Sequence, residues 1–124
     1  MNVVDSSAWL EYFADGPNAG AFARSIEAIG ELIVPTLTLY EVFKRVCSQR
    51  GEDDALRAIA QMEQGQVVGL DRAIALDAAR LSLQRRLPMA ESIILATSEL
   101  RRATLWTQDS DFADVPGVRY FARR

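Results

Sequence analysis

Short apolar runs alternate along the whole chain with segments of helical periodicity, and this alternation most constrains the fold. The apolar runs predict five buried strands, over residues 1–4, 31–34, 66–70, 104–107 and 118–121. Helical spacing predicts helices over residues 6–14, 18–29, 36–49, 53–64 and 89–102, with another that Asp71 caps and that runs to about residue 86. Strands that alternate with helices favour an α/β fold, with a central, mostly parallel sheet of about four to five strands and helices on both faces.

The length and composition predict one globular domain over residues 1–124, of which 49% are hydrophobic and 25% charged. The longest stretch without a charge, residues 32–40, is far shorter than the roughly 20 residues that span a bilayer. The N-terminal residues lack a basic segment followed by an apolar one. With Cys47 as the only cysteine, we expect a reducing cytoplasm and no membrane partner.

The residue types that are missing restrict the chemistry. The chain has no histidine, which excludes an imidazole base, Ser-His-Asp and Cys-His catalysis, and metal sites that contain histidine. A single cysteine excludes cysteine-rich zinc sites and disulfide scaffolds. Carboxylates must therefore carry any chemistry, and a group of carboxylates suits Mg²⁺ or Mn²⁺.

Five acidic residues stand where a parallel sheet places its ligands. Asp5 ends the first predicted strand, and Asp109 and Asp111 follow the fourth. Glu41 lies in the helix after the second strand, and Glu91 in the first turn of the helix that leads to the fourth. Ligands of open parallel sheets bind beyond the carboxyl ends of the strands, so these acids can meet in one cleft.

Each acid also has a local structural interpretation. Asp5 suits the N-cap of the first helix. Thr38 and Glu41 fit a capping box, and Glu41 with Arg45 fits an ion pair along a helix. An acid at position 91 is favoured by the helix dipole, although Glu91 enters a helix that is apolar almost all round and needs a partner there. The aspartates after the fourth strand suit a turn.

Four motifs occur in order along nearly the whole chain: VVDSSAW at 3–9, LYEV at 39–42, LPMAESIILAT at 87–97 and LWTQDSDF at 105–112. With these motifs the chain resembles the PIN domain family, most closely the VapC-type toxin ribonucleases of bacterial toxin–antitoxin pairs. The last motif is similar to the family's T-x-D-x-D-F ending. The third acidic position is usually Asp in this family, whereas here Glu91 is longer by one methylene.

The resemblance implies an Mg²⁺- or Mn²⁺-dependent endoribonuclease that leaves 5′-phosphate and 3′-hydroxyl ends. The implied catalytic residues, which would hold one or two ions, are Asp5, Glu41, Glu91 and Asp109. Asp111 would support the ions, and the hydroxyls of Ser6 and Thr107 would orient the carboxylates.

The net charge of −3 argues against an RNA partner until the five acids of the site are set aside, which leaves 12 acids and 14 bases. Candidate phosphate contacts are Lys44, Arg45, Arg85 and Arg86. The resemblance also implies a homodimer and a VapB-type antitoxin that lays a C-terminal segment across the active-site groove. The predicted helices that carry Leu39 and Leu56 offer apolar surface for such contacts.

Two other functions remain open on the sequence. A catalytically weakened PIN scaffold could act only as a binding module through its protein partner, with Glu91 as the altered residue. More distantly, Asp5 could be the nucleophile of an aspartate-based phosphotransfer domain. The dehalogenase-type version of that site needs a second Asp two residues later, where Ser7 stands.

Overall fold

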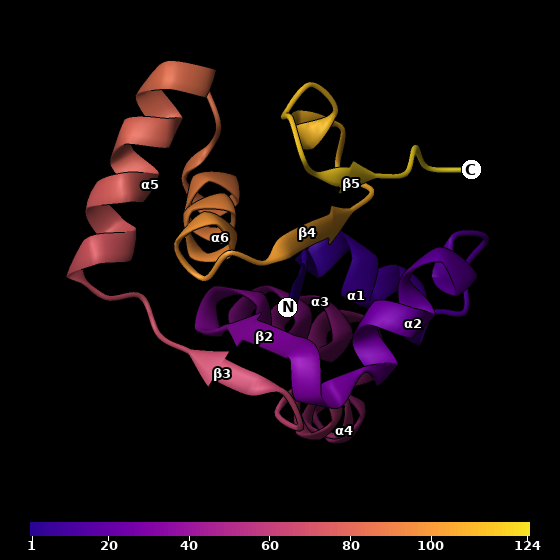
Figure 1. Cartoon of the computed structure of the whole chain (residues 1–124). Helices are drawn as coiled ribbons and strands as arrows, with labels where there is room; N and C mark the ends of the chain where they lie inside the picture. The colour runs from indigo at the N-terminus through magenta and orange to yellow at the C-terminus, as the bar shows by residue number, and fades with distance from the viewer.

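A single parallel sheet forms the centre of the protein in a computed structural model that describes residues 1–124 (Figure 1). Its strands are β1 (Asn2–Val4), β2 (Leu32–Pro35), β3 (Gln66–Val68), β4 (Thr104–Thr107) and β5 (Arg119–Tyr120). They are ordered β3-β2-β1-β4-β5, and all neighbouring pairs are parallel. The predicted α/β class and the five strands are thus confirmed.

Six α-helices connect and cover the strands. They are α1 (Ser6–Phe13), α2 (Ala19–Glu27), α3 (Thr36–Arg50), α4 (Glu52–Met62), α5 (Arg72–Arg85) and α6 (Met89–Leu100). Two short 3₁₀ helices, η1 (Ile29–Glu31) and η2 (Ser110–Phe112), precede β2 and follow β4. None of the helices combines the length and the apolar character that crossing a membrane requires.

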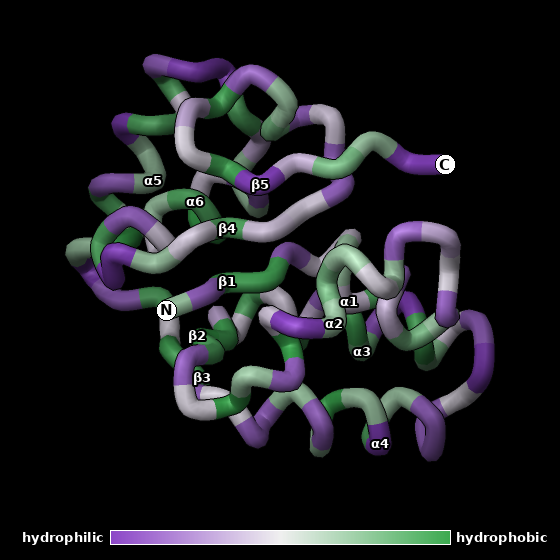
Figure 2. The backbone as a smooth tube through the Cα atoms, turned by 45° about the vertical axis from the view of Figure 1, so that its right-hand side comes forward, coloured by the Kyte–Doolittle hydropathy of each residue, from purple (hydrophilic) through white to green (hydrophobic).

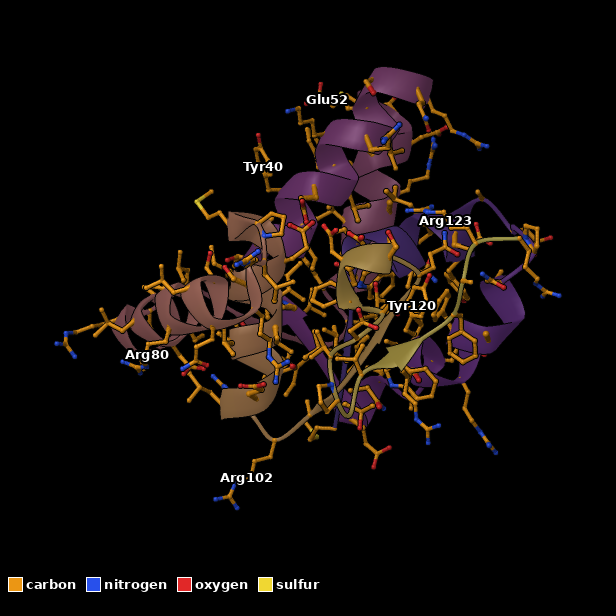
Figure 3. All side chains as sticks on the ribbon, turned by 90° about the horizontal axis from the view of Figure 1, so that it is seen from above. Tyr40, Glu52, Arg80, Arg102, Tyr120 and Arg123 are labelled. Atoms are coloured by element: carbon orange, nitrogen blue, oxygen red, sulfur yellow. The ribbon has the colours of Figure 1, made fainter.

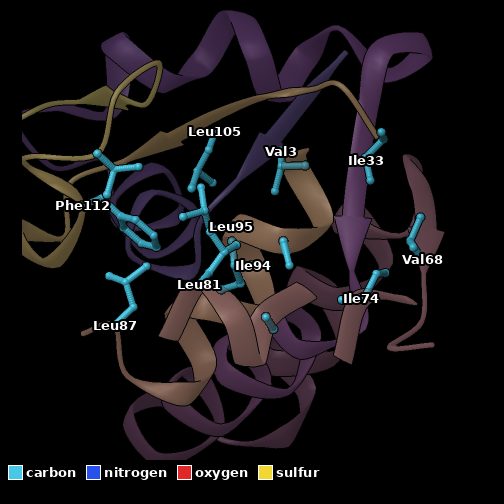
Figure 4. Packing of buried hydrophobic residues seen from close by; sticks show 13 residues of the cluster. Val3, Ile33, Val68, Ile74, Leu81, Leu87, Ile94, Leu95, Leu105 and Phe112 are labelled. Carbon is cyan, nitrogen blue, oxygen red and sulfur yellow. The ribbon is translucent and has the colours of Figure 1, made fainter. Parts of the chain in front are cut away.

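The side chains of the sheet alternate between two cores, as the two-residue period of a strand requires. Val3, Ile33 and Leu105 point to the side that α5 and α6 cover, where Figure 4 shows them packed against residues such as Ile94. Apolar residues of β1 and β4 stand out along the tube in Figure 2. The sheet is therefore buried on this face by the α5–α6 pair.

The opposite core lies under α1 to α4. Val4, Leu32 and Val34 pack there against the fully buried rings of Trp9 and Phe22. Helix α4 packs along α3 and contributes to the same cluster. The result is a three-layer arrangement of helices, sheet and helices, as predicted.

The register at the centre of the sheet determines where the site can form. Strand β1 lies between β2 and β4, with Val4 opposite Trp106, and the Asp5 amide continues the ladder by donating to the Trp106 carbonyl at 2.9 Å. Strand β2 pairs with one side of β1 and strand β4 with the other, so the carboxyl end of β1 is the switch point of the strand order. Asp5 and the residues that follow β4 are thus neighbours at the carboxyl edge.

Two local predictions for Glu41 were wrong. Helix α3 begins at Thr36, so Thr38 lies inside the first turn and its hydroxyl donates to the Pro35 carbonyl instead of capping the helix. No ion pair joins Glu41 to Arg45, since the two ion pairs of the structure are Arg57–Asp54 and Arg80–Asp77. The carboxylate of Glu41 therefore has a different role from local helix stabilisation.

Other predicted boundaries differ by one or two residues. Strand β3 ends at Val68 rather than residue 70, because its partner β2 ends at Pro35, opposite Val68. Pro88 is the N-cap of α6 rather than a residue of its first turn. The predicted cap of α5 is confirmed, since the Asp71 carboxylate accepts from the Ile74 amide at 2.9 Å.

Candidate active site

Asp5 is a buried carboxylate at the end of the central strand, with only 4% of its surface exposed. Its Oδ2 accepts from the Ser7 hydroxyl at 2.7 Å and from the Thr107 hydroxyl at 2.8 Å, while the Ser7 amide lies 3.4 Å away. Asp5 is the N-cap of α1, as its local interpretation predicted, but the hydroxyl of Thr107 comes from β4. Capping and the site thus share one carboxylate, whose orientation is fixed from two strands.

Glu41 approaches from α3, on the side of β2. Its Oε1 accepts from the Ser6 hydroxyl at 2.6 Å. Ser6 therefore orients Glu41 while Thr107 orients Asp5, and these are the two hydroxyl residues that the sequence indicated. A serine and a glutamate 35 residues apart are joined because α1 and α3 pack against each other beyond the strand ends.

Three further acids form the tightest group. Glu91, in the first turn of α6, Asp109 and Asp111 each offer a carboxylate oxygen, and these oxygens lie within 4.8 Å of one another. The Asp109 carboxylate accepts from the Asp111 amide at 2.9 Å, and the Asp109 amide donates to the Thr107 hydroxyl at 2.9 Å. The loop after β4 is thus held so that two of its carboxylates face α6.

The carboxylates repel one another and resist ionisation. Burial raises the pKa of Asp5, and the charge of Asp109 raises it further. The pKa of Glu41 is raised by burial and by the charges of Asp5 and Asp109. Burial also raises the pKa of Glu91 to about 7, and the charges of Asp109, Asp5 and Glu41 act in the same direction. A nearby positive charge would therefore favour the ionised form of these carboxylates.

The donor set fits a small divalent cation. All five acids offer oxygen, which Mg²⁺ and Mn²⁺ prefer, and the site contains neither sulfur nor nitrogen ligands. The oxygens of Glu91, Asp109 and Asp111 lie within 4.8 Å of one another and could therefore approach one ion together. Asp5 and Glu41 lie outside this group of three but close enough for their charges to act on Glu91.

The sequence interpretation missed Ser7. Its hydroxyl lies between Asp5 at 2.7 Å and the Thr107 hydroxyl at 3.2 Å, and it accepts from the Gln108 amide at 3.2 Å. A serine two residues after an N-cap aspartate is close enough for its hydroxyl to donate to the cap carboxylate, and this spacing is the signal that could have identified Ser7. Ser7 links the two strands that carry Asp5 and Asp109.

We expect Ser7→Ala to weaken Mg²⁺ binding by about 10–100-fold, because partners that orient ligand carboxylates typically have effects of this size. Titration calorimetry with Mg²⁺ measures the change, and circular dichroism checks that the variant is folded. Ser48→Ala, on the exposed side of α3, is the matched control and should bind like the wild type. Wild-type affinity in Ser7→Ala would contradict an orienting role.

The four basic residues that the sequence indicated for RNA lie as two adjacent pairs, one in α3 and one at the end of α5. The Lys44 ammonium lies 5.7 Å from the centre of the Tyr40 ring, whereas Arg45 lines a groove beside α1. Arg85 is in the last turn of α5, and Arg86 follows it in a left-handed conformation. All four are exposed.

Comparison with known proteins supports this description of the fold. The model of the family described as PIN domain matches residues 3–118, which is nearly the whole chain. The chain belongs to the PIN domain family. A search of curated proteins found no match to this PIN domain.

Several solved structures share the fold of this PIN domain over almost their full length. A toxin-antitoxin complex from Klebsiella pneumoniae is 24% identical with a TM-score of 0.78, and 95% of each chain is covered. VapC20 from Mycobacterium tuberculosis, described as a Sarcin-Ricin loop cleaving toxin, is 16% identical with a TM-score of 0.77, covering 96% of this chain and 98% of that one. VapBC2 from Rickettsia felis, bound to a promoter DNA fragment, is 9% identical with a TM-score of 0.75, covering 98% and 97%.

Proposed function

We propose that this PIN domain is the toxin of a VapBC-type toxin–antitoxin pair, and that it hydrolyses phosphodiester bonds of RNA with Mg²⁺ or Mn²⁺. One observation carries the proposal: five carboxylates from four separate segments gather at the switch point of the sheet, and the chain has no histidine that could act as a base beside them. A structurally similar protein is described as a toxin that cleaves the Sarcin-Ricin loop, which supports RNA as the substrate class.

Asp5, Glu41, Glu91 and Asp109 would hold the ion or ions, with Asp111 in support. A divalent ion bound there supplies a Lewis acid that makes water more acidic and offsets charge on the scissile phosphate. The residues of the chain do the positioning: Ser7 and Thr107 aim Asp5, and Ser6 aims Glu41. In the reaction, water adds to phosphorus and the bond to the 3′-oxygen breaks, which leaves a 5′-phosphate and a 3′-hydroxyl.

The partners follow from the same comparison. Similar structures include complexes described as VapBC, which supports a VapB-type antitoxin as the partner of this chain. The single cysteine favours the reducing cytoplasm as its location. Helices α3 and α4 present an apolar surface that includes Tyr40 and Leu56, with 60% and 53% of their surfaces exposed. This surface suits the antitoxin or a second copy in a homodimer.

The test is cleavage of total cellular RNA by the purified protein with Mg²⁺, with Mn²⁺ and with EDTA. We expect discrete fragments with either metal, none with EDTA, and none from Asp5→Asn under any condition. End-specific ligation of the fragments checks for the 5′-phosphate. Fragments that persist in Asp5→Asn would identify a contaminating nuclease.

A PIN scaffold that acts only by binding is the second candidate, and Glu91 in place of the usual Asp is the observation behind it. The two candidates differ in the Glu91→Asp variant. If the wild type is inactive and Glu91→Asp cleaves RNA, the site is a weakened nuclease. If both are inactive with either metal, the nuclease proposal is wrong and the binding module stands.

A further inference from the structure

A groove of about 530 Å³ lies along α1, α3 and α4 next to the carboxylate site, although none of the five acids of the site lines it. At one end it is lined by Ser7 and Gln108, and these are the residues that contact Asp5 and directly precede Asp109. The walls carry four arginines from three different elements: Arg45, Arg50, Arg57 and Arg123. The groove therefore joins a positively charged surface to the negatively charged site.

Two acids, Glu11 and Asp54, line the groove against four arginines, so its net charge is positive. The Glu11 carboxylate accepts from the Asn18 amide at 2.7 Å, and Asp54 pairs with Arg57. No ion pair engages Arg45, Arg50 or Arg123, whose side chains are exposed. Three guanidinium groups thus remain available to an anionic partner.

The C-terminal residues that carry Arg123 are held in place. The Asn18 side chain donates to the Gln108 side chain at 3.1 Å and to the Ala122 carbonyl at 2.9 Å. Arg124 donates to the Asn18 side chain at 3.0 Å and to the Pro17 carbonyl at 2.6 Å. Buried Asn18 thus holds the Ala122 carbonyl and the Arg124 side chain, which flank Arg123 in the sequence, and it also contacts the residue that precedes Asp109. Figure 3 labels Arg123 on the opposite side of the molecule from Arg80 and Arg102.

We propose that this groove binds the phosphates of the RNA on one side of the scissile bond, through Arg45, Arg50 and Arg123. The inference rests on the proposed function, since a strand whose phosphate is cleaved at the carboxylates must leave the site along the surface. The protein has a net charge of −3, and its site is more acidic still, so binding of a polyanion needs a local concentration of cations. Arginine suits this task because its planar fork makes paired hydrogen bonds to phosphate.

The test compares RNA binding by the wild type and by the triple variant Arg45→Gln, Arg50→Gln, Arg123→Gln. Fluorescence anisotropy with a labelled single-stranded RNA of about ten nucleotides in EDTA measures affinity over a range of salt concentrations, without cleavage. Each phosphate contact to a single strand contributes about 0.7 to the slope of log K against log salt. We expect the triple variant to lose about 2 from that slope and to bind at least about tenfold more weakly.

The matched control replaces three exposed arginines elsewhere, in the variant Arg72→Gln, Arg101→Gln, Arg102→Gln. It makes the same change in net charge and should keep the wild-type slope. Cleavage adds a second readout: kcat/KM for the ten-nucleotide RNA should fall in the groove variant, while kcat/KM for a dinucleotide should not. Equal slopes in the wild type and the groove variant, or equal losses in the control, would overturn the proposal.

An acidic peptide is the competing occupant, and labelled poly-glutamate tests it. If the groove variant loses poly-glutamate binding and retains RNA binding, the groove belongs to a protein partner and the proposal is wrong. The experiments distinguish failure of the proposed function from failure of this inference. A wild type that binds RNA through the groove but does not cleave it with either metal would refute the nuclease alone, and a wild type that cleaves RNA with no contribution from the groove would refute only this inference.

Discussion

Asp109→Asn is expected to reduce RNA cleavage on the order of 10³-fold while it stabilises the metal-free protein. Asp109 belongs to the tightest group of acids, and its charge raises the pKa values of Asp5, Glu41 and Glu91. Removing one ligand charge weakens stabilisation of the transition state by several kcal/mol. The asparagine retains an oxygen for the Asp111 amide, which now bonds at 2.9 Å, so the loop should keep its conformation.

Relief of the repulsion should raise the melting temperature of the metal-free protein by about 2–5 °C, the size that about 1 kcal/mol gives in a domain of this length. Saturating Mg²⁺ should stabilise the wild type and leave the variant almost unchanged. The control is Asp114→Asn, an exposed acid five residues further along the chain, which should match the wild type in both assays. A lower melting temperature in metal-free Asp109→Asn would show that the acids are not in repulsive contact.

The second large effect is a dependence of metal binding on pH. Burial and the neighbouring carboxylates raise the pKa of Glu91 to about 7, and an ion binds the ionised form. Between pH 8 and pH 6 the ionised fraction falls about tenfold, so the apparent affinity for Mg²⁺ should fall by about the same factor. Titration calorimetry at pH 6, 7 and 8 measures this change.

Glu91→Gln should bind Mg²⁺ weakly and with a much smaller dependence on pH, while the exposed Glu63→Gln should behave like the wild type. The stability of the metal-free protein should change with pH in the opposite direction from the affinity for Mg²⁺. The folded protein holds the proton of Glu91 more tightly than the unfolded chain does. The contribution of Glu91 to the stability of the metal-free protein is therefore greatest below pH 4.5 and falls as the pH rises to about 7. A Glu91→Gln variant as dependent on pH as the wild type would assign the titration to another group.

The local elements of this fold were predictable because each has a strong local signal. Apolar runs bounded by charge gave the strands, and the α5 helix begins at the cap that its sequence indicates, Asp71. The pairing of β1 with β4 has no such signal, since it joins residues about 100 positions apart and depends on how the helices pack. The residue at which a strand such as β3 ends is determined by where its partner strand ends, and not by the residues of the strand itself.

The candidate acids could be selected from their positions, directly after strands for three of them and in helices next to strands for Glu41 and Glu91, but their partners were only partly predictable. Ser6 and Thr107 flank acids in the sequence, and each donates to a carboxylate of the site. Ser7 was missed because a serine in a first helical turn has an ordinary local use. The arginine groove could be predicted only in part. Arg45 was a candidate phosphate contact from the sequence, but Arg50 and Arg123 line one groove with it only after α3 and the C-terminal residues have taken their places.

The central position of β1 has a consequence for synthesis of the chain on the ribosome. The first strand emerges early, but its partner β4 begins at Thr104, and Asp109 and Asp111 follow still later. A nascent chain that lacks these residues has neither the complete sheet nor the acids that complete the site. Because non-local contacts of this kind form late in folding, the protein should become able to act on RNA only after the residues up to Asp111 have been synthesised.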